Sequence, residues 1–192
     1  NYVPTRDVLK LKGTPDVAAL LDKTKKIIAA FAHIKRGGAS AVEKIIHRLQ
    51  EGTLTFESLS YGVLMDRLYA GAMGLGGFYS PIGLGTLVEE GKEKRVINGI
   101  EYLFEYPIKL DVGLVKATLA DTFGNLVYTG TARGPNTIIA MASTYTIAEV
   151  FDIVEPGQLD PERIGTPGIF IDKIVKVPEE DIESRQRRLG IV

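Results

Sequence analysis

The sequence of 192 residues predicts an α/β domain with an open, mainly parallel sheet flanked by helices. Two observations carry this prediction. Segments at 16–21, 39–50 and 56–72 show the helical spacing of apolar side chains, and after Lys94 the spacing changes to an alternation of period two. The connections between the expected strands are also long enough to cross over, which parallel pairing requires. The chain contains no internal repeat and no low-complexity linker, so we predict one domain over residues 1–192.

Helices are expected in the first part of the chain. In residues 39–50 the side chains of Val42, Ile45, Ile46 and Leu49 form one apolar stripe, and Gly52 follows as a C-terminal stop. Residues 56–72 continue as one amphipathic helix, and a shorter helical pattern covers residues 16–21.

Strands are expected in the second part. Asn98-Gly99 separates two extended runs within residues 96–103, which indicates a tight hairpin. Further strands are predicted at 111–118, 126–131, 144–154 and 168–177, with a turn at 121–125, a short helix at 136–143 and a loop at 156–167. The charged tail from Glu179 is interpreted as a solvated face.

Composition excludes several function classes. Apolar residues make up 45% of the chain, and 23 basic residues balance 24 acidic ones, so neither nucleic acid nor an anionic membrane surface is an expected partner. No apolar run approaches the roughly 18 residues of a membrane-spanning helix. The absence of cysteine excludes disulfides and thiolate sites, and we predict a cytoplasmic protein. The chain begins at Asn1 without a methionine or a leader pattern, so we expect that an N-terminal part of the fold precedes it.

The glycine-rich stretch at residues 76–93 does not fit a nucleotide-binding loop. A Walker A loop needs four residues between its glycines and then Lys-Ser/Thr, whereas five residues separate Gly85 from Gly91 and Glu93 follows the lysine. The glycines around Gly76 and Gly83 lack the third glycine of a dinucleotide-binding fingerprint.

Metal and hydrolase motifs are not found either. His33 and His47 lie on different predicted elements without a carboxylate at a familiar ligand spacing, so we predict no metal site. No Gly-x-Ser-x-Gly elbow is present, and a carboxylate nucleophile stays possible on residue type alone.

Two loops combine glycine with polar residues where strands are expected to end, at 78–86 and 129–136. In open α/β sheets ligands bind beyond the carboxyl ends of strands, where glycine lets the backbone approach a ligand. Ordinary turns explain the same composition, and the residues alone leave both interpretations open.

The order of motifs resembles the A (alpha) subunit of family I CoA-transferases, of the glutaconate, acetate and 3-oxoacid types. The run GFYSPIGLGT at 77–86 precedes EEGKE at 89–93 and INGIEY at 97–102. Further similar segments follow in order, at residues 111–117, 120–128, 131–133, 147–150, 155–161 and 166–172.

This resemblance implies the open α/β fold of these enzymes (NagB/RpiA-like) and an acyl-CoA site. Coenzyme A is then a substrate, and no cofactor or metal is expected. The catalytic glutamate of the family lies in a Ser-Glu-Asn-Gly motif of the beta subunit, so this chain supplies no catalytic residue and works in a hetero-oligomer with that partner. Its implied contribution is the wall of the site, formed by Phe78, Ser80, Pro81, Gly83, Gly85, Thr86, Thr131, Ala132 and Asn136.

The family reaction moves CoA between an acyl-CoA and a carboxylic acid through a glutamyl-CoA thioester. Two alternatives stay open: an acyl-CoA hydrolase on the same scaffold, acting on thioesters or opening rings, and a non-catalytic ligand-sensing module.

Overall fold

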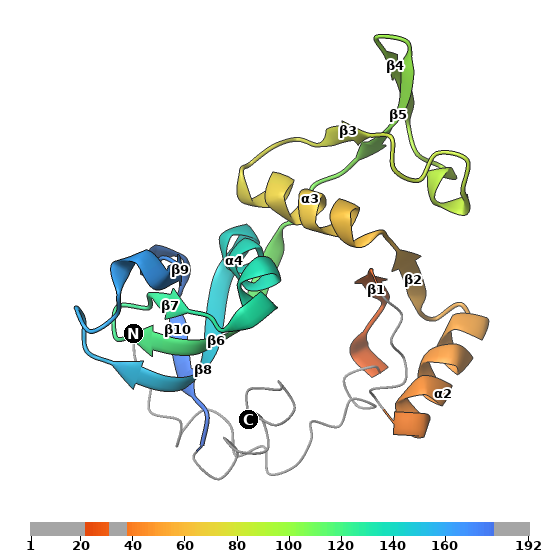
Figure 1. The fold of residues 1–192 in the computed structure, drawn as a ribbon. Helices are drawn as coiled ribbons and strands as arrows, with labels where there is room; N and C mark the ends of the chain where they lie inside the picture. Colours follow the sequence, from red (N-terminus) through yellow and green to blue (C-terminus); the bar gives the residue numbers. More distant parts are fainter. Residues whose placement is uncertain (1–21, 31–37, 179–192) are drawn as a thin grey trace. The chain divides into compact units, whose positions relative to one another are not determined.

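The computed structural model describes residues 22–30 and 38–178 of the chain (Figure 1). The helix expected at 16–21, His33 and the tail from Glu179 lie outside these residues. The chain divides into two compact units. The hairpin unit contains the described part of Leu11–Arg67 together with Gly77–Tyr106, and the sheet unit contains Leu68–Gly76 and residues 107–178.

The sheet unit is built on five strands in the order β10-β8-β6-β7-β9. Its long central strands are β6 (Leu110–Asp121) and β8 (Ser143–Val154), flanked by β10 (Lys173–Lys176), β7 (Leu126–Val127) and β9 (Ile164–Thr166). Short 3-10 turns lie between them, as η3 (Gly130–Ala132), η4 (Pro161–Arg163) and η5 (Gly168–Phe170).

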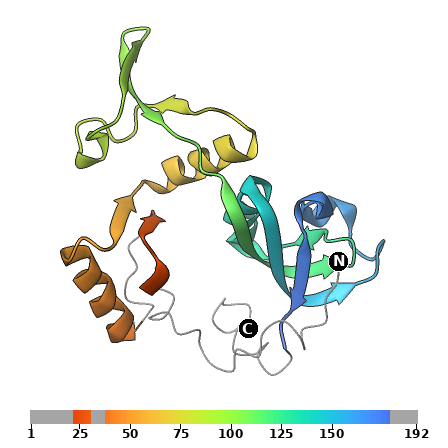
Figure 2. The same cartoon turned by 180° about the vertical axis from the view of Figure 1, so that it is seen from behind.

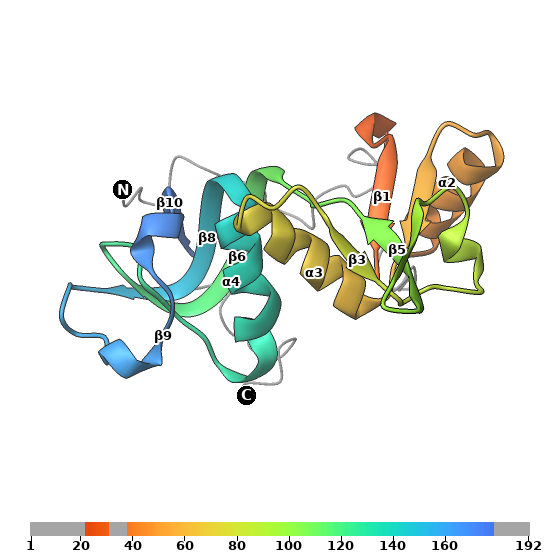
Figure 3. The same cartoon turned by 90° about the horizontal axis from the view of Figure 1, so that it is seen from above.

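Parallel and antiparallel strand pairs lie in different parts of this sheet. β6 pairs with β8 in parallel, and β8 pairs with β10 in parallel. Helix α4 (Arg133–Ala142) lies on the crossover from β6 to β8, as Figure 3 shows. The short strands β7 and β9 pair antiparallel at the other edge. The predicted class, an open α/β sheet with parallel strands at its centre, is confirmed, with an antiparallel edge added.

The core of the sheet unit lies between α4 and the sheet. Alternate residues of β6 and β8, such as Val115 and Ala148, are buried at 3% and 0% exposure. Since successive side chains of a strand point to opposite faces, the alternation fixes which face meets the helix. The other buried members are Ala117, Ala120, Leu126, Tyr128, Ala140, Val150 and Ile174.

In the hairpin unit, β1 (Lys26–Ala29) and β2 (Thr55–Ser58) pair in parallel, and α2 (Gly38–Gln50) connects them. Helix α3 (Tyr61–Ala72) follows, with residues 61–67 in this unit and residues 68–72 in the sheet unit. Its residue Arg67 donates to Glu57 on β2 and to the carbonyl of Tyr106. Helix α2 confirms the helix predicted at 39–50.

A second, three-stranded antiparallel sheet completes this unit in the order β3-β5-β4 (Figure 2). Its strands are β3 (Phe78–Ser80), β4 (Lys94–Ile97) and β5 (Ile100–Glu105). Asn98 and Gly99 connect β4 to β5 with φ angles of 50° and 80°. Positive φ at both positions is the geometry of the predicted hairpin turn, which is confirmed.

Several predicted boundaries are wrong. Residues 56–58 belong to strand β2 and not to the helix. The helix begins only at Tyr61, because Ser60 caps it by accepting from the Val63 amide at 3.2 Å. The strand expected at 126–131 stops after Val127, and its remainder turns through η3. The loop at 156–167 contains strand β9, and the strand at 168–177 begins only at Lys173.

Among the described residues, no helix is long and apolar enough to cross a membrane. That residues 1–192 form a single domain stays a prediction.

Candidate functional site

The inner face of the three-stranded sheet carries the first group of predicted site residues. Phe78 lies opposite Glu105 and Ser80 opposite Leu103, so these four side chains share one face. Leu103 is completely buried, and Ser80 is 6% exposed. The loop that follows, residues 81–89, is called the glycine loop below.

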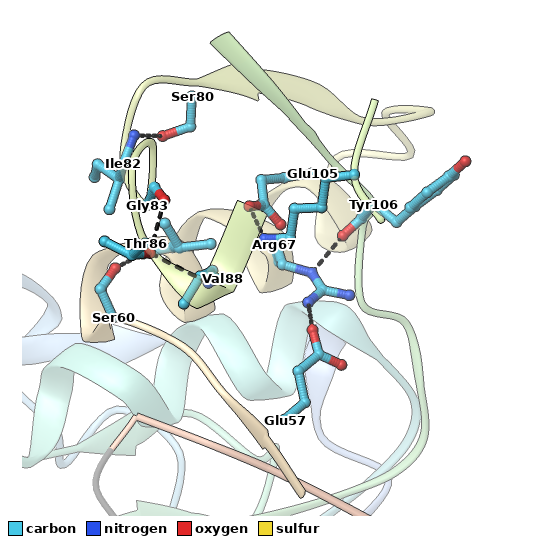
Figure 4. Close-up of polar contacts among 12 residues, drawn as sticks. Glu57, Ser60, Arg67, Ser80, Ile82, Gly83, Thr86, Val88, Glu105 and Tyr106 are labelled. Atoms are coloured by element: carbon cyan, nitrogen blue, oxygen red, sulfur yellow. Dashed lines mark hydrogen bonds and ion pairs between the residues drawn. The ribbon is translucent and has the colours of Figure 1, made fainter. Parts of the chain in front are cut away.

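The glycine loop packs on this face. A Cβ placed on Gly83 would lie 3.5 Å from Leu103 Cδ1 and 3.2 Å from Val88 Cγ1. Gly83 therefore lies close to the buried leucine, and Figure 4 shows Val88 beside it. A larger residue at position 83 would push the loop away from the sheet.

The two hydroxyls predicted to face a substrate are engaged within the loop. Thr86 Oγ1 donates to the Gly83 carbonyl at 2.7 Å and accepts from the Val88 amide at 3.2 Å. Thr86 thereby caps the 3-10 turn η2 (Leu87–Glu89). Ser80 Oγ accepts from the Ile82 amide at 3.2 Å. Both hydroxyls thus stabilise the shape of the loop.

Glu89, the last residue of the glycine loop, bonds back to Gly85 near the middle of the loop. Its carboxylate accepts from the Gly85 amide at 2.7 Å and pairs with Lys94 at 3.0 Å. The Gly85 amide, followed by Lys94, holds the pKa of Glu89 below its ordinary value. Gly85 has a φ of 72°, and a Cβ added to it would meet no heavy atom within 4 Å, so the loop is open at this point.

The segment after η2 is attached to the sheet by polar contacts that motif matching did not identify. Lys92 Nζ donates to Glu105 Oε1, and Glu105 is 1% exposed. Tyr79 donates to Glu93 at 2.6 Å, and the Phe104 amide donates to the Glu93 carbonyl at 2.9 Å. The signal that could have found Glu105 is its place at an inward-facing position of a buried strand, where a charge needs a partner.

The second group of predicted site residues lies in the sheet unit. Thr131 and Ala132 form part of η3, and Thr131 is exposed. Asn136, on α4, accepts from the Lys116 amide at 3.0 Å and donates to the Ala132 carbonyl at 2.6 Å. Asn136 therefore ties the start of the helix to strand β6.

A buried hydroxyl network supports the same helix start. Tyr128 and Thr166 share a hydrogen bond of 2.7 Å, and Thr137 on α4 lies 3.0 Å from Thr166. Burial raises the pKa of Tyr128, which stays protonated and available as a donor. Arg133 donates to the Arg163 carbonyl at 3.3 Å, so its side chain reaches toward the segment before β9.

The structure thus brings together Phe78, Ser80, Pro81, Gly83, Gly85 and Thr86 within the hairpin unit, and Thr131, Ala132 and Asn136 within the sheet unit. That both groups line one acyl site stays a prediction. Residues 22–30 and 38–178 hold no group of three or more potential metal ligands among His, Asp and Glu.

The comparisons with known proteins all point to one family. The sequence profile described as Coenzyme A transferase matches residues 17–177. The chain is 44% identical over 164 residues to the A subunit of the probable succinyl-CoA:3-ketoacid coenzyme A transferase of Bacillus subtilis, covering 83% of this chain and 69% of that protein. It is 41% identical over 167 residues to the A subunit of the 3-oxoadipate CoA-transferase of Pseudomonas putida, covering 86% and 70%.

A shorter match reaches the alpha subunit of the acetate CoA-transferase of Escherichia coli, at 41% identity over 128 residues, 67% of this chain and 58% of that protein. The chain thus spans between 58% and 70% of the length of these relatives.

Solved structures support the fold. The glutaconate coenzyme A-transferase of Acidaminococcus fermentans superposes with a TM-score of 0.71 at 19% identity, covering 85% of this chain and 58% of that chain. An acyl-CoA transferase of Escherichia coli gives 0.65 at 22% identity, covering 73% and 31%. The motif order, the fold and the match over residues 17–177 agree, and the chain belongs to the coenzyme A transferase family.

Proposed function

We propose that this chain is the A (alpha) subunit of a CoA-transferase that moves CoA between an acyl-CoA and a carboxylic acid, in a hetero-oligomer with a beta subunit. The observation that carries the proposal is the family match over residues 17–177, which includes the glycine loop and the Lys92 segment. The relatives' names, each of which denotes the A or alpha subunit of a CoA-transferase, support the same assignment.

The reaction proceeds in two half-reactions through a glutamate of the beta subunit. The glutamate carboxylate attacks the thioester carbonyl, the C–S bond breaks and CoA thiolate leaves, which gives an acyl-glutamyl anhydride. The thiolate then attacks the glutamyl carbonyl of the anhydride and expels the acyl group as a carboxylate, which leaves a glutamyl-CoA thioester. A second carboxylate receives CoA by the reverse steps. Covalent catalysis of this kind divides one difficult exchange into easier ones.

This chain contributes the wall of the acyl site. The sequence contains no Ser-Glu-Asn-Gly motif. Two of the acidic residues at the end of the glycine loop are engaged by other groups, since Glu89 accepts from the Gly85 amide and Glu93 accepts from Tyr79. These two carboxylates stabilise the loop, and the nucleophile of the proposed reaction is the glutamate of the beta subunit.

The test is CoA transfer from acetyl-CoA or succinyl-CoA to a panel of carboxylates, measured for the full-length protein alone and with its beta subunit. We expect turnover only when both are present. Robust turnover by the isolated protein would contradict the assignment and direct attention to its own glutamates.

Release of free CoA, measured in the same assay without a carboxylate acceptor, separates a transferase from a hydrolase. A transferase keeps CoA on the glutamate and releases at most one carboxylate per site until an acceptor is added, so free CoA does not accumulate, whereas a hydrolase releases CoA continuously. The absence of acyl-CoA binding by the complex would favour a sensing module. Residence in the cytoplasm remains part of this proposal.

A further inference from the structure

We propose that Lys92 is a positioning residue for the acyl site: its bond to the buried Glu105 fixes the glycine loop on the inner face of the β3-β5-β4 sheet. The proposal rests on the function proposed above and names the group that holds the wall of that site in place.

The register of the hairpin brings the two residues together. Ile97 pairs with Ile100 and Lys94 pairs with Leu103. Continuing this register by two positions places Lys92 opposite Glu105, where side chains share one face of the ribbon. Lys92 comes shortly after the η2 turn, so its ion pair with Glu105 joins the end of the loop to strand β5.

Glu105 also lies beside the predicted site on that face. Its partner across the sheet is Phe78, and the neighbouring pair on the same face is Ser80 and Leu103. Leu103 lies directly beneath Gly83. The ion pair is therefore at one end of the surface on which the glycine loop rests, and Leu103 is near its middle.

A continuous chain of hydrogen bonds runs from Lys92 back to the open part of the loop. The Lys92 amide donates to the Glu89 carbonyl at 3.1 Å, and the Glu89 side chain accepts from the Gly85 amide at 2.7 Å. A displacement of Lys92 is thus passed to Gly85 through one intervening residue.

The environment of the pair explains why it fixes a position. The side chains of Lys92 and Glu105 are 19% and 2% exposed. A buried carboxylate without a partner is strongly unfavourable, so the loop has one position in which Glu105 is satisfied. The pair of Lys26 with Glu57 is more exposed, at 50% and 25% of the two side chains, and imposes a weaker restriction.

The test uses the full-length protein with its beta subunit and compares Lys92→Met, Lys92→Arg and the double variant Lys92→Met/Glu105→Gln. Lys92→Met leaves a buried charge unpaired, so both Tm and kcat/KM should fall. The double variant removes that charge and should recover most of the Tm, while kcat/KM stays about tenfold to a hundredfold below wild type, because the loop is no longer fixed. Lys92→Arg should retain most activity, and Lys26→Met is the matched control.

Hydrogen exchange of the Gly85 and Val88 amides gives a readout that does not depend on activity. We expect faster exchange at both amides in Lys92→Met and in the double variant, and unchanged exchange in Lys26→Met. Recovery of both Tm and kcat/KM by the double variant, or unchanged exchange in the loop, would overturn the positioning role. A wild-type complex without CoA transfer, combined with faster loop exchange in the variants, would refute the proposed function and leave the role of the ion pair intact.

Discussion

Gly85 gives the sharpest test of whether the glycine loop lines the acyl site. Its φ of 72° lies in the left-handed region, and a Cβ at this position meets no heavy atom within 4 Å. Gly85→Val is therefore opposed by backbone strain alone, about 1–2 kcal/mol for a residue with a side chain in this region. For a protein of this size that strain lowers Tm by roughly 2–8 °C.

Gly99→Val is the matched control. Gly99 has a φ of 80° and equally open surroundings, but it lies at the tip of the β4–β5 hairpin. Both variants should lose similar stability. In the complex with the beta subunit, Gly85→Val should also lose most of its kcat/KM per folded molecule, because the added isopropyl group enters space that the acyl group needs.

The measurement is Tm and kcat/KM on the same preparations of both variants. Equal falls in Tm with normal turnover in both would refute the acyl-wall assignment of the glycine loop, since the strain is matched and only the location differs. A fall in turnover for Gly99→Val alone would place the chemistry at the hairpin tip instead.

Three further predictions follow from individual contacts. Thr86→Val removes the cap of η2 and should lower stability by about 1 kcal/mol; an unchanged Tm in thermal unfolding would show that the cap contributes nothing. Asp121→Ala removes a 3%-exposed carboxylate that accepts from the Phe123 amide and twice from Asn125, and should destabilise by about 3 kcal/mol in urea unfolding, whereas a loss below about 1 kcal/mol would contradict this. Burial would raise the pKa of Glu57, but bonds to Lys26 and Arg67 outweigh it and hold that pKa below 4.5, so this stabilisation is present above about pH 4.5 and is lost as pH falls through the folded pKa. In Tm measured from pH 6 to pH 3, Arg67→Met should therefore show a smaller acid-induced fall than wild type, and an equal fall would exclude Glu57 as a contributor.

Local features of the fold were predictable from the sequence. Asn98-Gly99 fixes its hairpin because few residue pairs accept two positive φ angles, and this preference does not depend on the rest of the chain. The apolar stripe of 39–50 likewise identified α2. The start of α3 was missed because Leu59 and Val63, four residues apart, continue a helical spacing across Ser60.

The strands that were missed depend on distant partners. Residues 55–58 are extended because they pair with residues 26–29, and β9 is extended because it pairs with β7. Neither short segment has enough apolar alternation of its own to indicate a strand. Such pairing becomes visible only when the neighbouring strand is in place.

The site shows a similar limit. The family resemblance marked Ser80 and Thr86 as wall residues of the site, but a hydroxyl beside glycine also suits a turn, and both have backbone partners within three residues. Glu105 escaped motif matching because its role depends on a partner 13 positions away. The register that follows from Asn98-Gly99 already places Lys92 opposite it, so this contact could have been derived from the hairpin.

In the glycine loop, polar side chains bond to the backbone of the loop itself and hold its conformation. The hydroxyl of Thr86 and the carboxylate of Glu89 are both committed to bonds inside the loop, with the Gly83 carbonyl and the Gly85 amide. Groups already paired in this way gain little by turning to a substrate, since one hydrogen bond would replace another. We therefore propose that selectivity for an acyl group depends on where the glycine backbone lies, with Leu103 beneath the loop and the ion pair of Lys92 at its end setting that position. Substitutions on the inner face of the sheet should then alter acyl preference even though none of these side chains needs to touch the substrate.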